Sequence, residues 1–109
     1  MTIDILKEAI KNKYVISFEY LKQGKVRGVR IGNPHAVFNM HKKDYSTSIK
    51  VHIYQTDGVS DTDEKIPSFR TFDIEHLSNV SIIKPEKTFI PSEDYNPDWK
   101  GYNDPICKI

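Results

Sequence analysis

The side chain best placed to do chemistry in this sequence is Arg70, in the predicted strand 68–74. Residues two apart in a strand share a face, so Arg70 points the same way as Phe72 and Ile74, which belong in a core. A guanidinium on that face is costly unless an anion or hydrogen bonds meet it. Arg70 is therefore either a structural arginine or a contact for a phosphate-bearing ligand. The structural partners would be Asp73, Glu75 or Glu19.

Arg30 is the second candidate ligand contact. It shares a strand face with Val26 and Gly28, and small residues nearby let a ligand or another backbone approach closely. The alternative is an ordinary solvated arginine. Tyr20 ends the first predicted strand. It is either a ligand contact or a buried ring with a hydrogen-bonded hydroxyl, which is the commoner arrangement.

A basic and aromatic row is predicted on one strand at residues 49–54. His52 and Tyr54 alternate with the apolar residues Val51 and Ile53, so they share the opposite face, together with Lys50. Rows of this kind stack bases and hold phosphates. They also occur on solvent faces and in dimer interfaces, and Lys50 is assigned to a solvent face.

Other reactive residue types do not form sites in this sequence. The histidines show no HxH or HxxxH spacing, so no metal site is predicted. Cys107 has no histidine near it in the sequence, and no paired carboxylates or phosphate loop is visible. We therefore predict neither an enzyme nor a bound cofactor. Trp99, Tyr95 and Tyr102 could stack a base, but docking of a tail or a subunit interface is simpler.

Bulk properties fit one small cytoplasmic domain. The chain has 109 residues, a formal net charge of +1 and one cysteine. This charge is not that of a generally cationic nucleic-acid binder, and a lone cysteine suits a reducing compartment. We see no signal peptide and no apolar run near the ~20 residues that cross a bilayer.

The hydrophobic pattern predicts one helix followed by short strands. Apolar residues recur at helical spacing over 2–12, and residues 14–31 read as a hairpin that Pro34 ends. Further strands are predicted at 36–40, 49–54, 68–74 and 79–83, with a polar loop at 56–65. This order and spacing favour a small, strongly bent β-barrel. After Pro85, prolines alternate with aromatic residues, which predicts an extended tail wrapped over the domain.

Four motifs in sequence order carry a family resemblance. They are Ile16-Ser17-Phe18-Glu19-Tyr20, Arg30-Ile31-Gly32-Asn33-Pro34, Val51-His52-Ile53-Tyr54, and Phe69-Arg70-Thr71-Phe72 leading into a short turn. Their arrangement over residues 4–90 resembles the WYL domain, a small SH3/Sm-like barrel. The namesake Trp-Tyr-Leu is absent, because the corresponding region reads Asp44-Tyr45-Ser46-Thr47-Ser48-Ile49. The sequence also has no room for the helix-turn-helix of the transcription regulators in that family.

The resemblance implies a mainly β protein with an N-terminal helix, in which a WYL-like SH3/Sm-type barrel spans residues 1–90. Residues 91–109 form a C-terminal tail packed on it. WYL domains are regarded as sensors of nucleic-acid fragments or nucleotide-like effectors. The residues that would carry this role here are Tyr20, Arg30, His52, Tyr54 and Arg70.

Two hypotheses of function follow. The first is a module that senses or sequesters a negatively charged, nucleotide-like ligand or short single-stranded nucleic acid. The second is an adaptor that forms a homo-oligomer or grips a protein partner through exposed strand edges and the aromatic tail. Salt dependence discriminates between them, because phosphate binding weakens as ionic strength rises.

Overall fold

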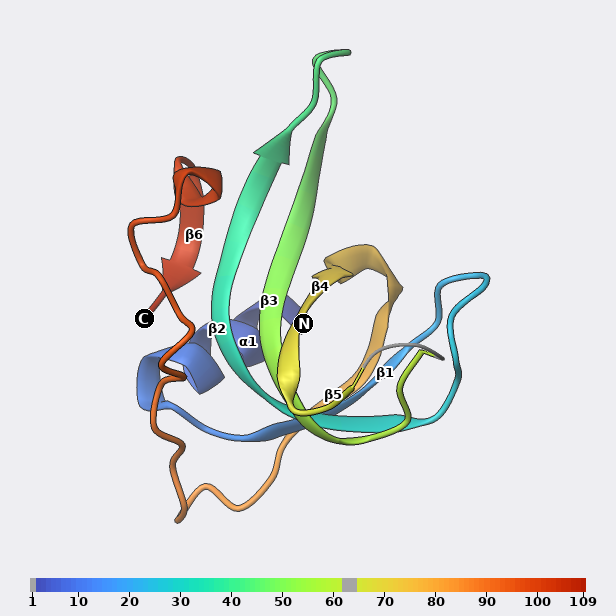
Figure 1. The fold of residues 1–109 in the computed structure, drawn as a ribbon, viewed down its shortest axis with the longest axis vertical. Helices are drawn as coiled ribbons and strands as arrows, with labels where there is room; N and C mark the ends of the chain where they lie inside the picture. The colour runs from blue at the N-terminus through green and yellow to red at the C-terminus, as the bar shows by residue number, and fades with distance from the viewer. Residues whose placement is uncertain (1, 62–64) are drawn as a thin grey trace.

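The computed structural model describes residues 2–61 and 65–109. It is a mainly β structure with one α-helix at the N-terminus of the described chain, as predicted (Figure 1). The elements are α1 (Thr2–Asn12), β1 (Ile16–Tyr20), β2 (Val29–His41), β3 (Thr47–Gly58), β4 (Ser68–Asp73), η1 (Ile74–His76), β5 (Leu77–Ile82), η2 (Lys100–Tyr102) and β6 (Pro105–Lys108).

The helix and the first hairpin form where the sequence predicts them. Leu6, Ala9 and Ile10 are the buried face of α1, which packs against β2, β5 and β6. The helix ends where Lys13 takes a positive φ of 58°, and the Tyr14 N–H then bonds to the Ala9 carbonyl at 2.8 Å. This closure turns the chain directly into β1, which pairs antiparallel with β2.

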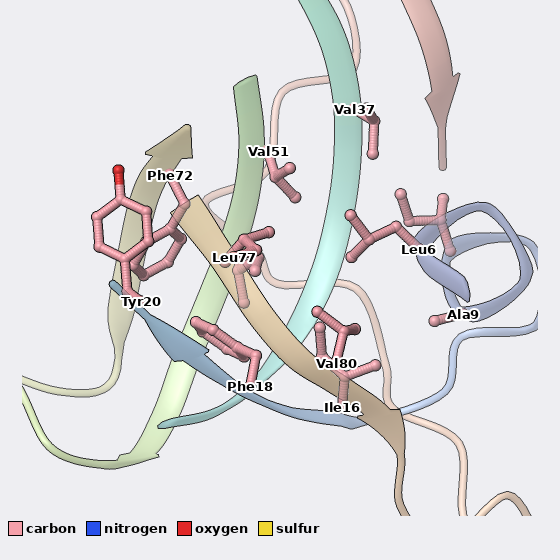
Figure 2. Packing of buried hydrophobic residues seen from close by; sticks show 12 residues of the cluster. Leu6, Ala9, Ile16, Phe18, Tyr20, Val37, Val51, Phe72, Leu77 and Val80 are labelled. Atoms are coloured by element: carbon pink, nitrogen blue, oxygen red, sulfur yellow. The ribbon is translucent and has the colours of Figure 1, made fainter. Parts of the chain in front are cut away.

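The core lies inside the bend of one antiparallel sheet with the strand order β4-β3-β2-β1-β5. Figure 2 shows the aromatic part of this core, where the Phe72 ring meets Phe18 and Tyr20 edge-on. The ring centroids lie 5.1 and 4.8 Å apart. Such pairs stabilise a fold by about 0.5–1.5 kcal/mol beyond the area they bury. Phe72 therefore fastens the β4 edge to β1 across the bend.

The sheet is bent and open. The strands at the two ends of the order, β4 and β5, are joined through η1, and in the described residues no hydrogen-bonded ladder closes one onto the other. The barrel expected from the sequence is therefore not confirmed; an open, antiparallel, strongly curved sheet is what forms (Figure 1).

The expectation that Pro34 ends a strand is wrong. β2 runs from Val29 through Pro34 to His41, so the end of the predicted hairpin 14–31 and the predicted strand 36–40 belong to one element. Pro34 is tolerated because its position falls between two partners on the same edge: β1 pairing ends at Gly32 and β6 pairing begins at Ala36. A register shift at Pro34/Ala36 marks the site, as expected for a proline within a sheet.

The predicted polar loop at 56–65 is also partly wrong. Its first three residues continue β3 to Gly58, which lies opposite Arg30 in the β2–β3 ladder. Residues 62–64 of that loop lie outside the described residues. The long β2–β3 hairpin projects from one end of the molecule (Figure 1).

The C-terminal segment adds a strand that the sequence analysis missed. β6 pairs antiparallel with the second half of β2, with Cys107 opposite Val37. Phe89 and Tyr102 are buried, and the Tyr95 hydroxyl donates to the carbonyl of Ile109 at 2.9 Å. Tyr95 and Tyr102 of this segment pack with Ala36 and Phe38 of β2, and Cys107 packs against the core cluster that contains residues of α1. No helix among the described residues has the length and apolar character to span a membrane.

Candidate functional site

The structure divides the five candidate residues between two places. Tyr20, Arg30 and Arg70 line one cleft of about 360 Å³, which we call the basic cleft. His52 lines a second cavity on the other side of the β4 edge, and Tyr54 lies on the same face of β3 as His52. The full lining of the basic cleft is Tyr20, Lys22, Lys25, Arg30, Lys50, Asp61, Phe69, Arg70, Thr71, Phe72 and Asp73.

Arg30 is fully buried, so the alternative of an ordinary solvated arginine is wrong. Its guanidinium donates to Gln55 Oε1 at 3.3 Å, to the Val26 carbonyl at 3.1 Å and to Asp61 Oδ1 at 3.3 Å. Burial opposes ionisation of Asp61, but the Val26 N–H and the charges of Arg30 and Lys25 outweigh it and hold the pKa of that carboxyl low. Arg30 joins β2, β3 and the loop after β3.

Arg70 is also buried, with 6% of its surface exposed, as its strand register predicts. Its Nε donates to Ser68 Oγ at 2.9 Å, and its Nη2 donates to Ser60 Oγ at 2.9 Å and to the Lys65 carbonyl at 3.4 Å. These hydrogen bonds orient the guanidinium. Arg70 therefore places an oriented guanidinium in the floor of the basic cleft.

Asp73, one of the partners expected for Arg70, binds two lysines instead. Lys22 Nζ lies 2.7 Å from its Oδ2, and Lys50 contacts its Oδ1. The Tyr20 hydroxyl accepts from the Asp73 N–H at 2.9 Å and donates to Oδ2 at 3.4 Å. Burial works against the charged form, but the two lysines prevail and lower the pKa of Asp73 to about 2. Tyr20 accordingly has a buried ring and a hydrogen-bonded hydroxyl.

Most of the charged side chains that line the basic cleft in the described part of the chain are basic. Among the described residues that line it, five lysines and arginines face two carboxylates. The side chains of Lys22 and Lys25 are 43% and 44% exposed, whereas those of Arg30 and Arg70 lie in the floor. Flexible ammonium groups at a rim and a fixed guanidinium below them are suited to bind an anion.

The second cavity, which we call the aromatic cavity, has a volume of about 240 Å³. Its lining consists of His52, Phe69, Asp94, Tyr95, Asn96, Trp99 and Tyr102. A hydrogen bond of 2.6 Å joins His52 Nδ1 to the Tyr102 hydroxyl. Burial lowers the pKa of His52, with a smaller contribution from His35, and burial raises the pKa of Tyr102 to about 12. At neutral pH both groups are therefore uncharged.

Comparison with known proteins bears on the fold alone. No protein-family model and no curated protein matches this sequence. Among solved structures, the chain is similar to proteasome accessory factor B/C (PafBC) of Arthrobacter aurescens, with a TM-score of 0.63 at 17% sequence identity. The similarity covers 88% of this chain but only 13% of that one. The chain thus shares its fold with a small part of a much longer protein.

His35 is a central residue that the sequence analysis missed. It is fully buried beside Phe89 and Phe69, with ring centroids 5.2 and 4.8 Å away. Its Nε2 accepts from the Ser92 N–H at 3.1 Å, so Nδ1 carries the proton and donates to the Asn33 carbonyl at 2.8 Å. The run His35-Ala36-Val37-Phe38 is buried throughout, and such runs indicate a strand covered on both faces.

Potential metal ligands do not gather in the described residues. No group of three or more histidine, cysteine, aspartate or glutamate side chains there could hold a metal ion. Cys107 is half-buried in β6.

Proposed function

We propose that this protein is a binding module for a negatively charged, nucleotide-like or short single-stranded nucleic-acid ligand, which it senses or sequesters without catalysis. The observation that carries the proposal is the basic cleft, where cationic side chains from β2, β3, β4 and the β1–β2 turn converge. The ligand would be negatively charged because the positive side chains of the described lining outnumber the carboxylates.

Each cleft residue has a distinct role in this proposal. Arg70 meets a phosphate from the floor with its oriented guanidinium, and Lys22 and Lys25 close on it from the rim. Arg30 holds the floor together through Asp61 and Gln55.

We assign the stacking role that was expected of His52 and Tyr54 to a different aromatic residue. His52 lines the aromatic cavity, and neither residue lines the basic cleft. Phe69 lines both the basic cleft and the aromatic cavity, so we assign contact with a base to Phe69.

The fold supports the same proposal by analogy. PafBC contains a WYL domain, so the structural similarity gives weak support to a WYL-like fold of the SH3/Sm type. The resemblance of the sequence motifs to WYL domains points the same way and implies sensing of nucleotide-like ligands. A cytoplasmic location fits this role and stays a prediction.

Native mass spectrometry with a mixture of nucleotides and short oligonucleotides would find the ligand. A matched pair of charge reversals then tests the cleft. Lys25→Glu at the rim should weaken binding of a labelled single-stranded oligonucleotide at least about fivefold at low salt. Lys43→Glu makes the same charge change at the exposed tip of the β2–β3 hairpin and should leave affinity nearly unchanged. Equal weakening by both would contradict binding in the cleft.

Arg70→Ala tests the floor of the basic cleft. It should abolish binding while the protein stays folded by circular dichroism. Because Arg70 is buried, Lys25→Glu provides the independent test if this variant unfolds.

The rival proposal is an adaptor that forms a homo-oligomer or binds a protein. It is favoured by the two terminal strands of the sheet, β4 and β5, and by Tyr45 and Ile90, which are 99% and 87% exposed. Sedimentation at low and high salt distinguishes the two. Stable oligomers at high salt that bind no nucleotide would support the adaptor, because apolar association resists screening.

A further inference from the structure

The aromatic cavity differs from the basic cleft in both chemistry and origin. Its rings come from two distant parts of the chain: His52 and Phe69 from β3 and β4, and Tyr95, Trp99 and Tyr102 from the C-terminal segment. The C-terminal segment thus completes a cavity on the outer face of the sheet. Phe69 is the one described residue of this cavity that the proposed binding of an anion also uses.

The rings are inclined to one another at different angles. Trp99 stands at 84° to Tyr102 with centroids 5.1 Å apart, and it is tilted by 34° from His52 at 5.3 Å. Tyr95 lies 6.1 Å from Tyr102 at 47°. A flat base prefers parallel ring faces, whereas a rounded group can contact several differently inclined rings at once. The arrangement therefore suits a compact, rounded group.

The backbone fixes the position of Trp99. A Cβ at Gly101 would lie 2.1 Å from Cζ3 of the indole, so the ring occupies the space that any other side chain would take. This packing holds the indole in place although Trp99 remains 43% exposed. One wall of the cavity is therefore both accessible to a ligand and preorganised.

The charge of the cavity selects the sign of its ligand. Among its described lining residues, Asp94 is the charged group, and no lysine or arginine is present. His52 is neutral at pH 7 because burial lowers its pKa, so it does not repel a cation. Aromatic faces attract cations through their quadrupole, and a carboxylate at the rim strengthens this attraction.

From these observations we propose that the aromatic cavity is a second ligand site, which binds a small organic cation of the trimethylammonium type. Trp99, Tyr95 and Tyr102 supply ring faces, Phe69 and His52 supply apolar contact, and Asp94 supplies the negative charge. A volume of about 240 Å³ is below the roughly 300–1,000 Å³ of sites for drug-sized ligands and suits a small headgroup.

The test uses Trp99 as a reporter, because it is the single tryptophan of the chain. Choline should change the tryptophan fluorescence in a saturable way at constant ionic strength. Its neutral isostere, 3,3-dimethylbutan-1-ol, should bind at least about tenfold more weakly, as expected where a cation interacts with several rings. Equal affinity for both would show a merely apolar cavity and overturn the proposal.

Variants at three positions place the site. Gly101→Ala should weaken choline binding by displacing the indole, and Asp94→Asn should weaken it by removing the charge. Tyr95→Leu should weaken it more than Tyr95→Phe, because both lose the bond to Ile109 but only the second keeps a ring. Unchanged affinity for choline in Gly101→Ala, Asp94→Asn and Tyr95→Leu would overturn the assignment.

Competition with nucleotides provides the last check. If uridine or adenosine monophosphate saturates the Trp99 signal and choline does not displace it, the cavity is a base-stacking site and the cation proposal is wrong. If Lys25→Glu abolishes nucleotide binding and leaves choline binding intact, the two sites are separate. Failure of the anion proposal therefore leaves this one standing.

Discussion

At the scale of the residue, Asp73 controls the charge that the basic cleft presents. It holds Lys22 and Lys50, the latter expected from the sequence on a solvent face, and it receives the Tyr20 hydroxyl. A carboxyl whose folded pKa is about 2, against 3.8 unfolded, stabilises the folded state above pH ~4. That contribution is lost as the pH falls from about 4 to about 2, and its full size is roughly 2 kcal/mol.

We predict that Asp73→Asn lowers the free energy of unfolding by roughly 2 kcal/mol at pH 7, measured by urea denaturation. The difference from the wild type should shrink at pH 3. Glu86→Gln removes an exposed carboxylate and should change stability by less than about 0.5 kcal/mol. A difference that stays constant from pH 7 to pH 3 would contradict this account.

The same variant should strengthen anion binding in the basic cleft, since it frees the ammonium groups of Lys22 and Lys50 from their carboxylate. We expect a gain of about fivefold in affinity for a single-stranded oligonucleotide at low salt. A stability loss together with an affinity gain distinguishes a ligand site from a purely structural cluster. Weaker binding by a folded Asp73→Asn protein would count against the cleft.

Sequence reasoning at this scale placed residues but not their partners. The alternation of strand residues put Arg70 and Phe72 on one buried face, and both are buried. It did not show that His52 lines the aromatic cavity and Arg70 the basic cleft, because the position of a cleft depends on how the sheet bends. It also missed the aromatic cavity, because Trp99 and His52 are distant in the sequence and come into contact only in the folded structure.

At the scale of the element, β2 organises the molecule. It pairs with β3 along its length on one edge, and with β1 and then β6 on the other. Periodicity predicted α1, β1 and the centre of β3, because each buries one regular face. It failed at Pro34, because a proline is accepted in β2 between the residues that pair with β1 and those that pair with β6. It also failed at β6, because the prolines of the C-terminal segment did not indicate a strand. These outcomes depend on partners that are distant in sequence.

Close contact between β2 and β3 positions Arg30, and Gly58 permits that contact. Gly58 and Gly24 both have positive φ, at 90° and 85°. A Cβ at Gly58 would lie 2.2 Å from the Val29 carbonyl oxygen and 2.7 Å from the Arg30 Cα, whereas a Cβ at Gly24 would meet no atom within 4 Å. The pair therefore separates backbone strain from steric exclusion.

We predict that Gly24→Ala costs about 1 kcal/mol of unfolding free energy, the ordinary price of a positive φ. Gly58→Ala should cost more than about 3 kcal/mol, because rigid backbone atoms must move apart. Urea denaturation of both variants measures the difference. Similar losses would mean that the β2–β3 contact can relax, and that Arg30 is less firmly held than its hydrogen bonds indicate.

At the scale of the whole molecule, the net charge of +1 does not show that the basic cleft and the aromatic cavity differ in charge. The basic cleft gathers positive charge on one side of the β4 edge, and the aromatic cavity places Asp94 among uncharged rings on the other. Phe69 lines both. The proposals of two ligand classes on one small sheet therefore rest on the distribution of charge, which composition does not reveal.

The C-terminal segment is fastened to the sheet by a histidine that must remain neutral. His35 Nε2 accepts from the Ser92 N–H, and the groups in contact with the ring are Asn33, Tyr54, Phe69, Phe89 and Tyr95. Burial lowers the pKa of His35 below 6.5, and the bond to Asn33 opposes this only in part. Protonation of Nε2 would replace an attractive contact with two N–H groups facing each other.

We predict from this that acid destabilises the protein well before Asp73 titrates. Below pH 6.5 the unfolded chain takes up protons that buried His35 and His52 in the folded state refuse, so stability falls as the pH drops from 6.5 toward their folded pKa values. The slope should reach about 1.4 kcal/mol per pH unit for each histidine. Urea denaturation between pH 7.5 and 4.5 measures it, and hydrogen exchange at the Ser92 amide should accelerate over the same range.

His52→Gln should reduce the slope by about half, because His35 remains. Constant stability from pH 7.5 to 5 would show that both rings accept a proton in place, and that the bond between His35 and Ser92 does not fasten the segment to the sheet.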